Sequence, residues 1–500
     1  MRRAAFLLII LFLALGVMGP ETARAQPSSA PTGASATWSS DIIYFNLTSI
    51  TGKDSKGNII PKNLTVEFSG NGTTAEYKDT ISYQYYSNTI LAGSIGKSFA
   101  GSAVLSAEVP VVAVYKQVSS NSNPYSPILY TSFSLDQAGN GKFYVPSVER
   151  NPAFVSQIGV QNIEAVDLDL TLNFYPAGGG APYTATKAGV KSQSSYVFKL
   201  SDLPNFPLKF DGSLVITAVP SDHGNETADI VAAVQEVQGN GRQAFAYEGS
   251  AGGAGAIYMP SAMCKVGKTQ QTTTYAIQNV DSNPADVTIT YYDGMGRTVG
   301  TPEVKSAVPS DSKVSVSTCD VTGTAGKTVL SAVITGTKLV AMGKVQSTDG
   351  LMTAFLGSTV PPATNQPDNL YHVALPYVEW ANSTLGFRSY ISIMNVSGQP
   401  VQKLELDYSR RNGKYQPVKA VQQLASANTP LAVNARINSE PDQVNGALDK
   451  SKSFLGAVEV LSDQPVVVIV RVQRGVSGLP GVTTLGEDYS GINITNDPNS

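Results

Sequence analysis

The first side chains to consider are the two cysteines, because thiols can cross-link, bind metals or act as nucleophiles. Cys264 and Cys319 lie 55 residues apart. In an exported protein they would meet an oxidising medium and pair, which for a loop of this length stabilises a fold by about 4 kcal/mol. The alternative is two buried free thiols. A structural zinc site is excluded, because two thiols without a neighbouring histidine cannot complete its ligand set. We expect a Cys264–Cys319 disulfide and no metal site.

The two histidines, His223 and His372, are the next candidates for chemistry. Ser221, Asp222 and His223 have the residue types of a hydrolytic triad, but they are consecutive, and a triad is assembled in space rather than in sequence. Neither G-x-S-x-G nor H-E-x-x-H occurs. The sequence therefore predicts no catalytic residue and a protein that is not an enzyme.

Two further groups of side chains could bind a ligand. Asp222, Asn225, Glu226 and Asp229 offer oxygen ligands for Ca²⁺, but their spacing matches no EF-hand and favours a solvated loop. The tyrosine-rich stretch 77–86 could form a face for sugars or protein, although tyrosine is common in strands. We expect no cofactor and no bound metal.

The N-terminal residues have the pattern of an export signal. Arg2 and Arg3 precede the apolar run 4–18, and Ala23-Arg24-Ala25 forms a cleavage site before Gln26. The alternative is a retained anchor, for which the run is short. Residues 26–36 are expected to be a flexible linker.

Charge and hydropathy limit the partners of the mature chain. Without residues 1–25, 32 basic residues stand against 37 acidic ones, for a net charge of −5. No basic stripe is present, so we expect no nucleic-acid partner. No second apolar stretch approaches membrane length, so we expect no transmembrane segment in the mature chain.

The elements that position these side chains repeat about every 115 residues. An apolar strand that ends in asparagine recurs with steps of 117 and 116 residues, and a diverged copy precedes the others. A fixed period indicates one folded unit used several times. The four copies end at Asn46, Asn162, Asn279 and Asn395.

Each predicted unit contains the same series of strands. An entry strand carries a proline, as at Pro146, Pro260 and Pro376. After the asparagine comes a strand with apolar residues at every second position, and later an apolar return strand that ends in glutamine. In the last unit the alternating strand is one residue late, so we infer one extra loop residue within 397–400.

These patterns predict an all-β chain with a tandem array of four antiparallel β-sandwich domains. Charged residues make up only 15% of the sequence, and glycine, proline and tyrosine are plentiful. Short connectors containing proline would join the domains into a semi-rigid rod. The expected domains after the signal peptide and linker are 37–142, 143–256, 257–370 and 371–500.

Two of these motifs resemble Ig-like β-sandwich repeats of uncharacterised secreted bacterial surface proteins. One is Ile277-Gln278-Asn279 followed by 287–293, and the other is Phe454-x-Gly456 followed by 462–465. The resemblance implies an Ig-like fold and an extracellular or cell-surface location, and carries over no catalytic residue.

The function expected from these observations is that of an exported, non-enzymatic structural or adhesive protein of the cell surface or the extracellular matrix. Its partners would be cell-envelope or extracellular polymers, or further copies of itself in a filament or lattice. The alternative is a secreted carbohydrate-binding or polymer-binding protein. Fold analogy alone does not choose between them.

Overall fold

A computed structural model of the 500-residue chain shows an all-β protein with antiparallel sheets. No helix in the described part is long and apolar enough to span a membrane. The structure describes residues 6–11, 38–46, 52–70, 73–81, 87–91, 101–119, 128–131, 133–134, 137–222, 226–238, 243–321, 329–363, 366, 368–381, 386–410, 419–441, 453–479 and 482–494.

The described strands fall into four groups, here called units 1 to 4. Unit 1 contains β1 (Phe6–Leu11), β2 (Trp38–Asn46), β3 (Lys62–Gly70), β4 (Thr73–Ile81), β5 (Ser87–Leu91), β6 (Ser102–Ala107), β7 (Val111–Ser119), β8 (Ile128–Thr131) and β9 (Phe133–Ser134). Unit 2 contains β10 (Gly139–Asn140), β11 (Lys142–Arg150), β12 (Phe154–Asn162), β13 (Leu168–Pro176), β14 (Tyr183–Val190), β15 (Ser195–Lys199), β16 (Phe210–Pro220), β17 (Asp229–Gln238) and β18 (Ala244–Glu248).

The other two groups follow the same order along the chain. Unit 3 contains β19 (Ala254–Ala262), β20 (Thr272–Asn279), β21 (Ala285–Tyr292), β22 (Thr298–Val308), β23 (Lys313–Ser317), β24 (Leu330–Gln346) and β25 (Met352–Leu356). Unit 4 contains β26 (Tyr371–Trp380), β27 (Arg388–Asn395), β28 (Leu404–Arg410), β29 (Lys419–Ala425), β30 (Arg436–Ser439), β31 (Phe454–Ser462), β32 (Val466–Leu479), β33 (Val482–Ser490) and β34 (Ile492–Ile494).

All four units share one pairing scheme. In unit 2, β14-β13-β16-β11 form one run of paired strands and β15-β12-β17-β18 form a second. Units 1, 3 and 4 pair their equivalent strands in the same order, with β24 serving in both runs of unit 3. The last strands, β33 and β34, pair with β32 and β26 and so belong to unit 4.

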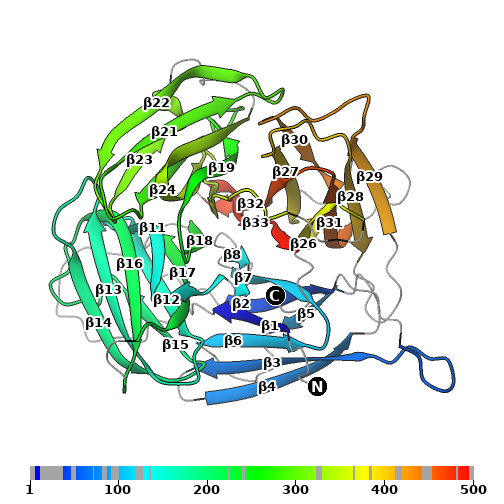
Figure 1. The fold of residues 1–500 in the computed structure, drawn as a ribbon, viewed down its shortest axis with the longest axis horizontal. Helices are drawn as coiled ribbons and strands as arrows, with labels where there is room; N and C mark the ends of the chain where they lie inside the picture. Colours follow the sequence, from blue (N-terminus) through cyan, green and yellow to red (C-terminus); the bar gives the residue numbers. More distant parts are fainter. Residues whose placement is uncertain are drawn as a thin grey trace.

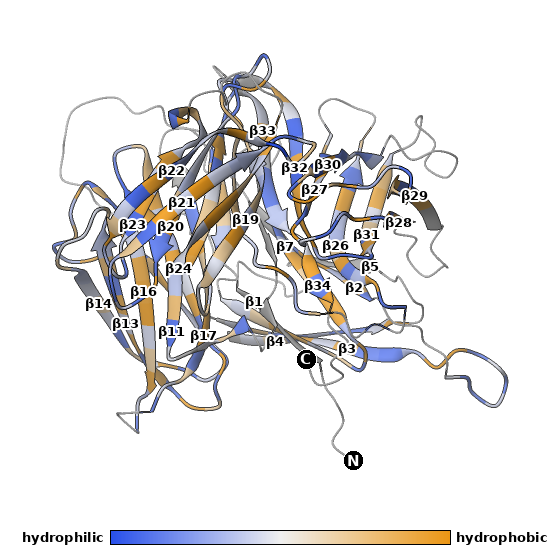
Figure 2. Cartoon of the chain, turned by 45° about the horizontal axis from the view of Figure 1, so that its top comes forward, coloured by the Kyte–Doolittle hydropathy of each residue, from blue (hydrophilic) through white to orange (hydrophobic). Residues whose placement is uncertain are grey.

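The alternating sequence patterns produce buried strand faces. Leu168, Leu170, Leu172 and Phe174 are all buried on β13, while the residues between them are partly exposed. Apolar and polar segments alternate along the strands in Figure 2. In β28 the apolar side chains Leu404, Leu406 and Tyr408 are buried, together with the polar residues Asp407 and Ser409. The extra residue inferred for the last unit is therefore confirmed, because it keeps the apolar side chains facing inward.

The entry prolines mark breaks in the strand ladders. The register of β11, β19 and β26 shifts at Pro146, Pro260 and Pro376 respectively. Proline has no N–H to donate, so the strand bulges there and resumes pairing beyond it.

The recurrent asparagine ends its strand by bonding to the backbone. The Asn279 amide nitrogen donates to the carbonyl oxygens of Asn283 (2.8 Å) and Val308 (2.9 Å), and its carbonyl oxygen accepts the N–H of Asp281. Asn162 and Asn395 make equivalent bonds, and all three are fully buried. The role of this asparagine is structural, since one side chain fixes the strand end and the following loop.

Replacing Asn279 with alanine is expected to lower the free energy of unfolding by about 2–4 kcal/mol, because two carbonyls and one N–H lose a buried partner. Urea unfolding measures the loss. Asn283→Ala is the matched control, since the Asn283 side chain is exposed and bonds only to Ser282 among the described contacts. Equal stability of the two variants would contradict this role.

The four units form a closed ring and not the rod expected from the sequence. The innermost strands β8, β18, β25 and β33 contact one another in cyclic order, so unit 4 contacts unit 1. Figure 1 shows the units arranged around a centre where β8, β18 and β33 lie. The prediction of an extended rod was wrong because it assumed that each sandwich buries its own core completely.

Each unit in fact contributes a side chain to the core of the preceding one. The four residues occupy equivalent positions on the return strands β7, β17, β24 and β32. Each lies three positions after the residue that pairs with the recurrent asparagine of its unit. Ala233 of unit 2 enters the core of unit 1, Met342 of unit 3 that of unit 2, Ile469 of unit 4 that of unit 3, and Val114 of unit 1 that of unit 4. Neighbouring units therefore stabilise each other by apolar burial.

The predicted disulfide between Cys264 and Cys319 is present in unit 3. Cys264 follows β19, and Cys319 lies in a 3-10 turn, Thr318–Asp320, after β23. The bond joins the connection after the entry strand to the opposite sheet run, and so restrains the two runs of unit 3 against each other.

Candidate functional site

Charged side chains occupy one repeated position near the centre of the ring. The position lies five residues after the return-strand residue that pairs with the recurrent asparagine. It holds Lys116 in unit 1, Gln235 in unit 2, Lys344 in unit 3 and Arg471 in unit 4. Three cations at equivalent places in a low-dielectric interior require partners.

Lys344 of unit 3 finds its partners in unit 2. Its ammonium lies 3.3 Å from Glu236 and 3.6 Å from Glu149. Burial raises the pKa of Glu236 to about 7, although Lys344 opposes this shift and Ser156 donates a hydrogen bond to the carboxylate. Burial alone would lower the pKa of Lys344, but the two carboxylates raise it. The group holds units 2 and 3 together.

Lys116 of unit 1 reaches unit 4 in the same manner. Its ammonium donates to the Tyr377 hydroxyl (2.6 Å) and lies 3.8 Å from Glu379, which also accepts from Tyr377. Burial lowers the pKa of Lys116, with Glu379 acting in the opposite direction. Glu149 and Glu379 both lie three residues after the entry proline, so the two interfaces repeat one contact.

In unit 4 the partner comes from the innermost strand of the same unit. Arg471 donates to Asp488 from Nε (2.8 Å) and Nη2 (2.7 Å), and Thr353 of unit 3 donates to the same carboxylate. Next to it, Glu487 accepts the backbone N–H groups of Ala246 (2.8 Å), Ala354 (2.8 Å) and Asp488 (2.9 Å). Glu487 is fully buried, and burial raises its pKa well above the ordinary value.

Glu487 therefore joins strands of three units at the centre of the ring. Ala246 lies on β18 of unit 2 and Ala354 on β25 of unit 3, and these edge strands would otherwise leave the two N–H groups without a strand partner. These central charged groups contact each other or the backbone. Their arrangement is suited to holding the ring closed.

The stability of the ring is expected to fall between pH 4.5 and 7. Glu236 has an ordinary pKa of 4.5 and a folded pKa of about 7, so the folded state keeps its proton where the unfolded chain loses it. The loss is about 3 kcal/mol at about 1.4 kcal/mol per pH unit. Thermal unfolding at pH 5 and 7 measures it.

The variant Glu236→Gln mimics the protonated side chain and should show a smaller decline over that range. The raised pKa of His372 acts with the same sign near neutral pH, because its partner contacts favour the protonated ring. Comparison of the His372→Gln and Glu236→Gln variants separates the contributions of His372 and Glu236 to the loss of stability with rising pH. A wild-type protein that gains stability from pH 5 to 7 would contradict the assignment.

His372 has acidic neighbours on both ring nitrogens. Nδ1 lies 2.7 Å from Glu459, and Nε2 lies 3.1 Å from both oxygens of Asp368. Burial would lower the pKa of His372, but Glu459 and Asp368 raise it. The cavity beside the ring, lined in part by Pro361 and Ile494, has a volume of about 10 Å³, room for about one water. His223 lies outside the described residues.

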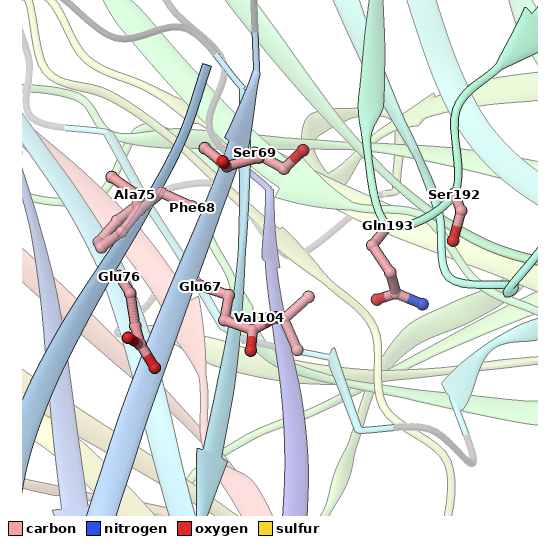
Figure 3. A pocket seen from close by; sticks show the side chains of 9 residues that line it. Glu67, Phe68, Ser69, Ala75, Glu76, Val104, Ser192 and Gln193 are labelled. Carbon is pink, nitrogen blue, oxygen red and sulfur yellow. The ribbon is translucent and has the colours of Figure 1, made fainter. Parts of the chain in front are cut away.

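A larger pocket lies between units 1 and 2. Its volume is about 460 Å³, and β3, β4 and β6 line one side while the loop between β14 and β15 lines the other. Figure 3 shows Gln193 of unit 2 facing Glu67 and Val104 of unit 1 across it. The lining residues are Glu67, Phe68, Ser69, Thr74, Ala75, Glu76, Val104, Ser192 and Gln193.

The pocket is acidic and hydrogen-bonding in character. Glu67 and Glu76 are directly paired across β3 and β4, and both are exposed. Like charges at such positions repel, and the Lys78 ammonium, 3.0 Å from Glu76, offsets part of that repulsion. Gln193 uses its amide nitrogen on the Ile163 carbonyl (2.8 Å), and Ser69 bonds to Ser194 across the unit boundary (2.8 Å). Such a pocket suits a ligand that donates hydroxyl hydrogens or carries positive charge.

The other candidates from the sequence contribute less to a site. Asn225 of the acidic loop and Tyr83, Tyr85 and Tyr86 lie outside the described residues. Asp229 lies by Glu164, and its pKa is raised by burial and by that carboxylate. Among the described residues no group of three or more histidine, cysteine or acidic side chains could hold a metal ion.

Sequence reasoning did not find Glu67, Glu76 or Glu487. The first two are separated by a hairpin and give no motif, and Glu487 is a single glutamate in the C-terminal segment of the sequence. No protein-family model matches this chain, and no curated protein matches it.

Proposed function

We propose that this protein is an exported, non-enzymatic structural or adhesive component of the cell surface or the extracellular matrix. The observation that carries the proposal is the ring of shared cores, which gives one rigid body whose outer edges can act as fixed contact surfaces. The buried charged groups named above stabilise unit boundaries, and the ring nitrogens of His372 are both held by carboxylates.

We further propose that the four units are Ig-like copies of one domain, with the bounds 37–142, 143–256, 257–370 and 371–500. Support comes from strand pairing. Counted from the entry strand β11 as the first, the second strand pairs with the fifth (β12 with β15) and the third with the sixth (β13 with β16), as in immunoglobulin sandwiches. Three strands depart from that fold. The entry strand β11 pairs mainly with β16, β14 pairs with β13, and β17 pairs with β12 and not with β16.

Electron microscopy of native cells labelled with antibody to the full chain tests the location and role. Label at the cell surface or in the surrounding matrix, lost in a deletion strain together with attachment or matrix cohesion, is the expected result. Label confined to the cytoplasm would overturn the proposal. Unchanged attachment and matrix cohesion in a deletion strain would contradict the structural role but not the export of the protein.

A second candidate function is carbohydrate or polymer binding, which the pocket between units 1 and 2 favours. Its carboxylates can accept hydrogen bonds from sugar hydroxyls. Unit 2 also exposes two aromatic rings, Tyr183 and Tyr196, and the Lys187 ammonium lies 4.8 Å from the Tyr196 ring centroid. Lys187 covers part of the Tyr196 ring and Tyr183 packs against Phe206 and Phe210, so it is the exposed edges of the two rings that are suited to contacting a sugar.

Binding to an array of extracellular polysaccharides tests this function. If the pocket is the site, the double variant E67Q/E76Q should weaken binding by about tenfold or more, since each lost charge-assisted hydrogen bond is worth about 1.5–3 kcal/mol. Glu405→Gln, a partly exposed residue of unit 4, is the control. If the folded wild-type protein binds no polysaccharide on the array, carbohydrate and polymer binding is excluded as the function.

A further inference from the structure

The entry strand of unit 1 differs in origin from those of the other three units. It is β1, which consists of residues 6–11 within the predicted export signal. Residues 12–37 separate it from β2, whereas only residues 151–153 separate β11 from β12 in unit 2. The N-terminal apolar run thus occupies a structural position that the other units fill with a strand continuous with the domain.

In units 2 to 4 this position is an essential part of the sandwich. The entry strand pairs antiparallel with β16, β24 or β31 of its unit and places at least three side chains in the core. The core residues are Phe143, Val145 and Val148 in unit 2, Ile257, Met259 and Ala262 in unit 3, and Val373, Leu375 and Val378 in unit 4.

In unit 1 the same position lies between β6 and β9. The register runs from Phe6 opposite Ala107 to Leu11 opposite Ser102, and Leu8 and Ile9 pair with β9 on the other side. β6 contributes Ala103, Leu105 and Ala107 to the core of unit 1. Without β1, one edge of β6 would present unpaired backbone groups beside an apolar core.

We propose that removal of the export signal opens this position, and that the exported ring takes up an extended apolar strand of a partner protein, antiparallel to β6. This inference rests on the proposed export of the chain. The occupant is a segment of at least six residues that is apolar and free of proline, as Phe6–Leu11 illustrates. The chain's own segments 26–36 and 495–500 are polar, so they do not supply such a strand.

The mode of binding is strand addition to a sheet edge. Backbone hydrogen bonds to β6 supply the geometry, and alternate apolar side chains enter the core to supply the driving force. A strand seated there restores the eight-strand scheme that the other units complete with their own chain.

The test uses the processed protein isolated from exporting cells, with its N-terminus determined by mass spectrometry. The probe is a synthetic peptide of residues 5–12 with a lysine tail for solubility. We expect saturable binding of one peptide per chain in calorimetry and a thermal midpoint that rises with peptide concentration. A peptide with proline in place of Ile9 should bind at least about tenfold more weakly, because proline breaks the ladder.

Cross-linking tests the register independently of affinity. A peptide with cysteine in place of Ile9 should form a disulfide with the variant Val104→Cys, since these positions are direct partners. The variant Ser102→Cys, which is opposite Leu11, is the matched control and should not react with that peptide.

The outcomes separate this inference from the export on which it rests. A processed N-terminus with no peptide binding, or with equal binding of the proline peptide, overturns strand uptake and leaves export standing. An intact N-terminus overturns strand uptake, because β1 then never leaves the position, and the location of the label in electron microscopy decides export separately. Cross-linking to both cysteine variants would show binding without the proposed register and would also overturn the inference.

Discussion

Replacing Glu487 with alanine is expected to lower the free energy of unfolding by about 3–6 kcal/mol. The substitution leaves three buried N–H groups, those of Ala246, Ala354 and Asp488, without their acceptor. Each orphaned buried donor costs about 1–3 kcal/mol. Because the donors lie in three different units, the loss should affect the whole ring and not unit 4 alone.

A graded series sharpens this prediction. Glu487→Gln keeps one acceptor oxygen and turns the other into a donor, so it should cost less than Glu487→Ala but more than the surface control Glu405→Ala. Urea unfolding gives the stabilities, and hydrogen exchange of the Ala246 and Ala354 amides gives the local effect. Unchanged protection of those two amides in Glu487→Ala would show that the carboxylate does not hold the central strands.

The second large effect is expected at the Arg471–Asp488 pair. Arg471→Met leaves a carboxylate that is fully buried, and Asp488→Leu leaves a guanidinium that is only 13% exposed. Breaking a buried pair from either side costs about 3–5 kcal/mol. The double variant R471M/D488L removes both charges and should be more stable than either single variant.

A double-mutant cycle measures this coupling. The expected result is a coupling energy of several kcal/mol, since each single variant leaves one buried charge without a partner and the double variant has neither charge. The Thr353 hydroxyl loses its acceptor in both variants that lack Asp488, so that contribution cancels in the comparison. Additive effects of the two substitutions would mean that the pair does not act as a unit.

Local features of the fold could be predicted from the sequence because they depend on neighbouring residues. Period-two alternation placed Leu170 and Leu406 on buried faces, and even the one-residue shift in the last unit could be read from the spacing. The recurrence of Asn279 at the end of an apolar strand could also be read from the sequence, and the structure gives its side chain two backbone partners there. The cysteine pairing followed from two thiols within one repeat.

The closure of the ring could not be predicted in this way. The partners of Lys116 and Lys344 lie in other units, up to 263 positions away in the case of Glu379, and no local pattern links them. Glu487 gave no signal because a single glutamate in a polar segment reads as a surface residue. The pocket gave no sequence signal because its lining comes from two units, as Glu67 of unit 1 and Gln193 of unit 2 illustrate.

Closure through shared cores has a consequence for how such a chain can evolve. In a linear array of domains, one domain can be added or deleted without loss of a required contact, because the two end domains have only one neighbour each. Here unit 1 both receives Ala233 and gives Val114 to unit 4, so every module is flanked on both sides. Closure therefore fixes the number of units, and a ring of three or five units would need a different angle at every junction.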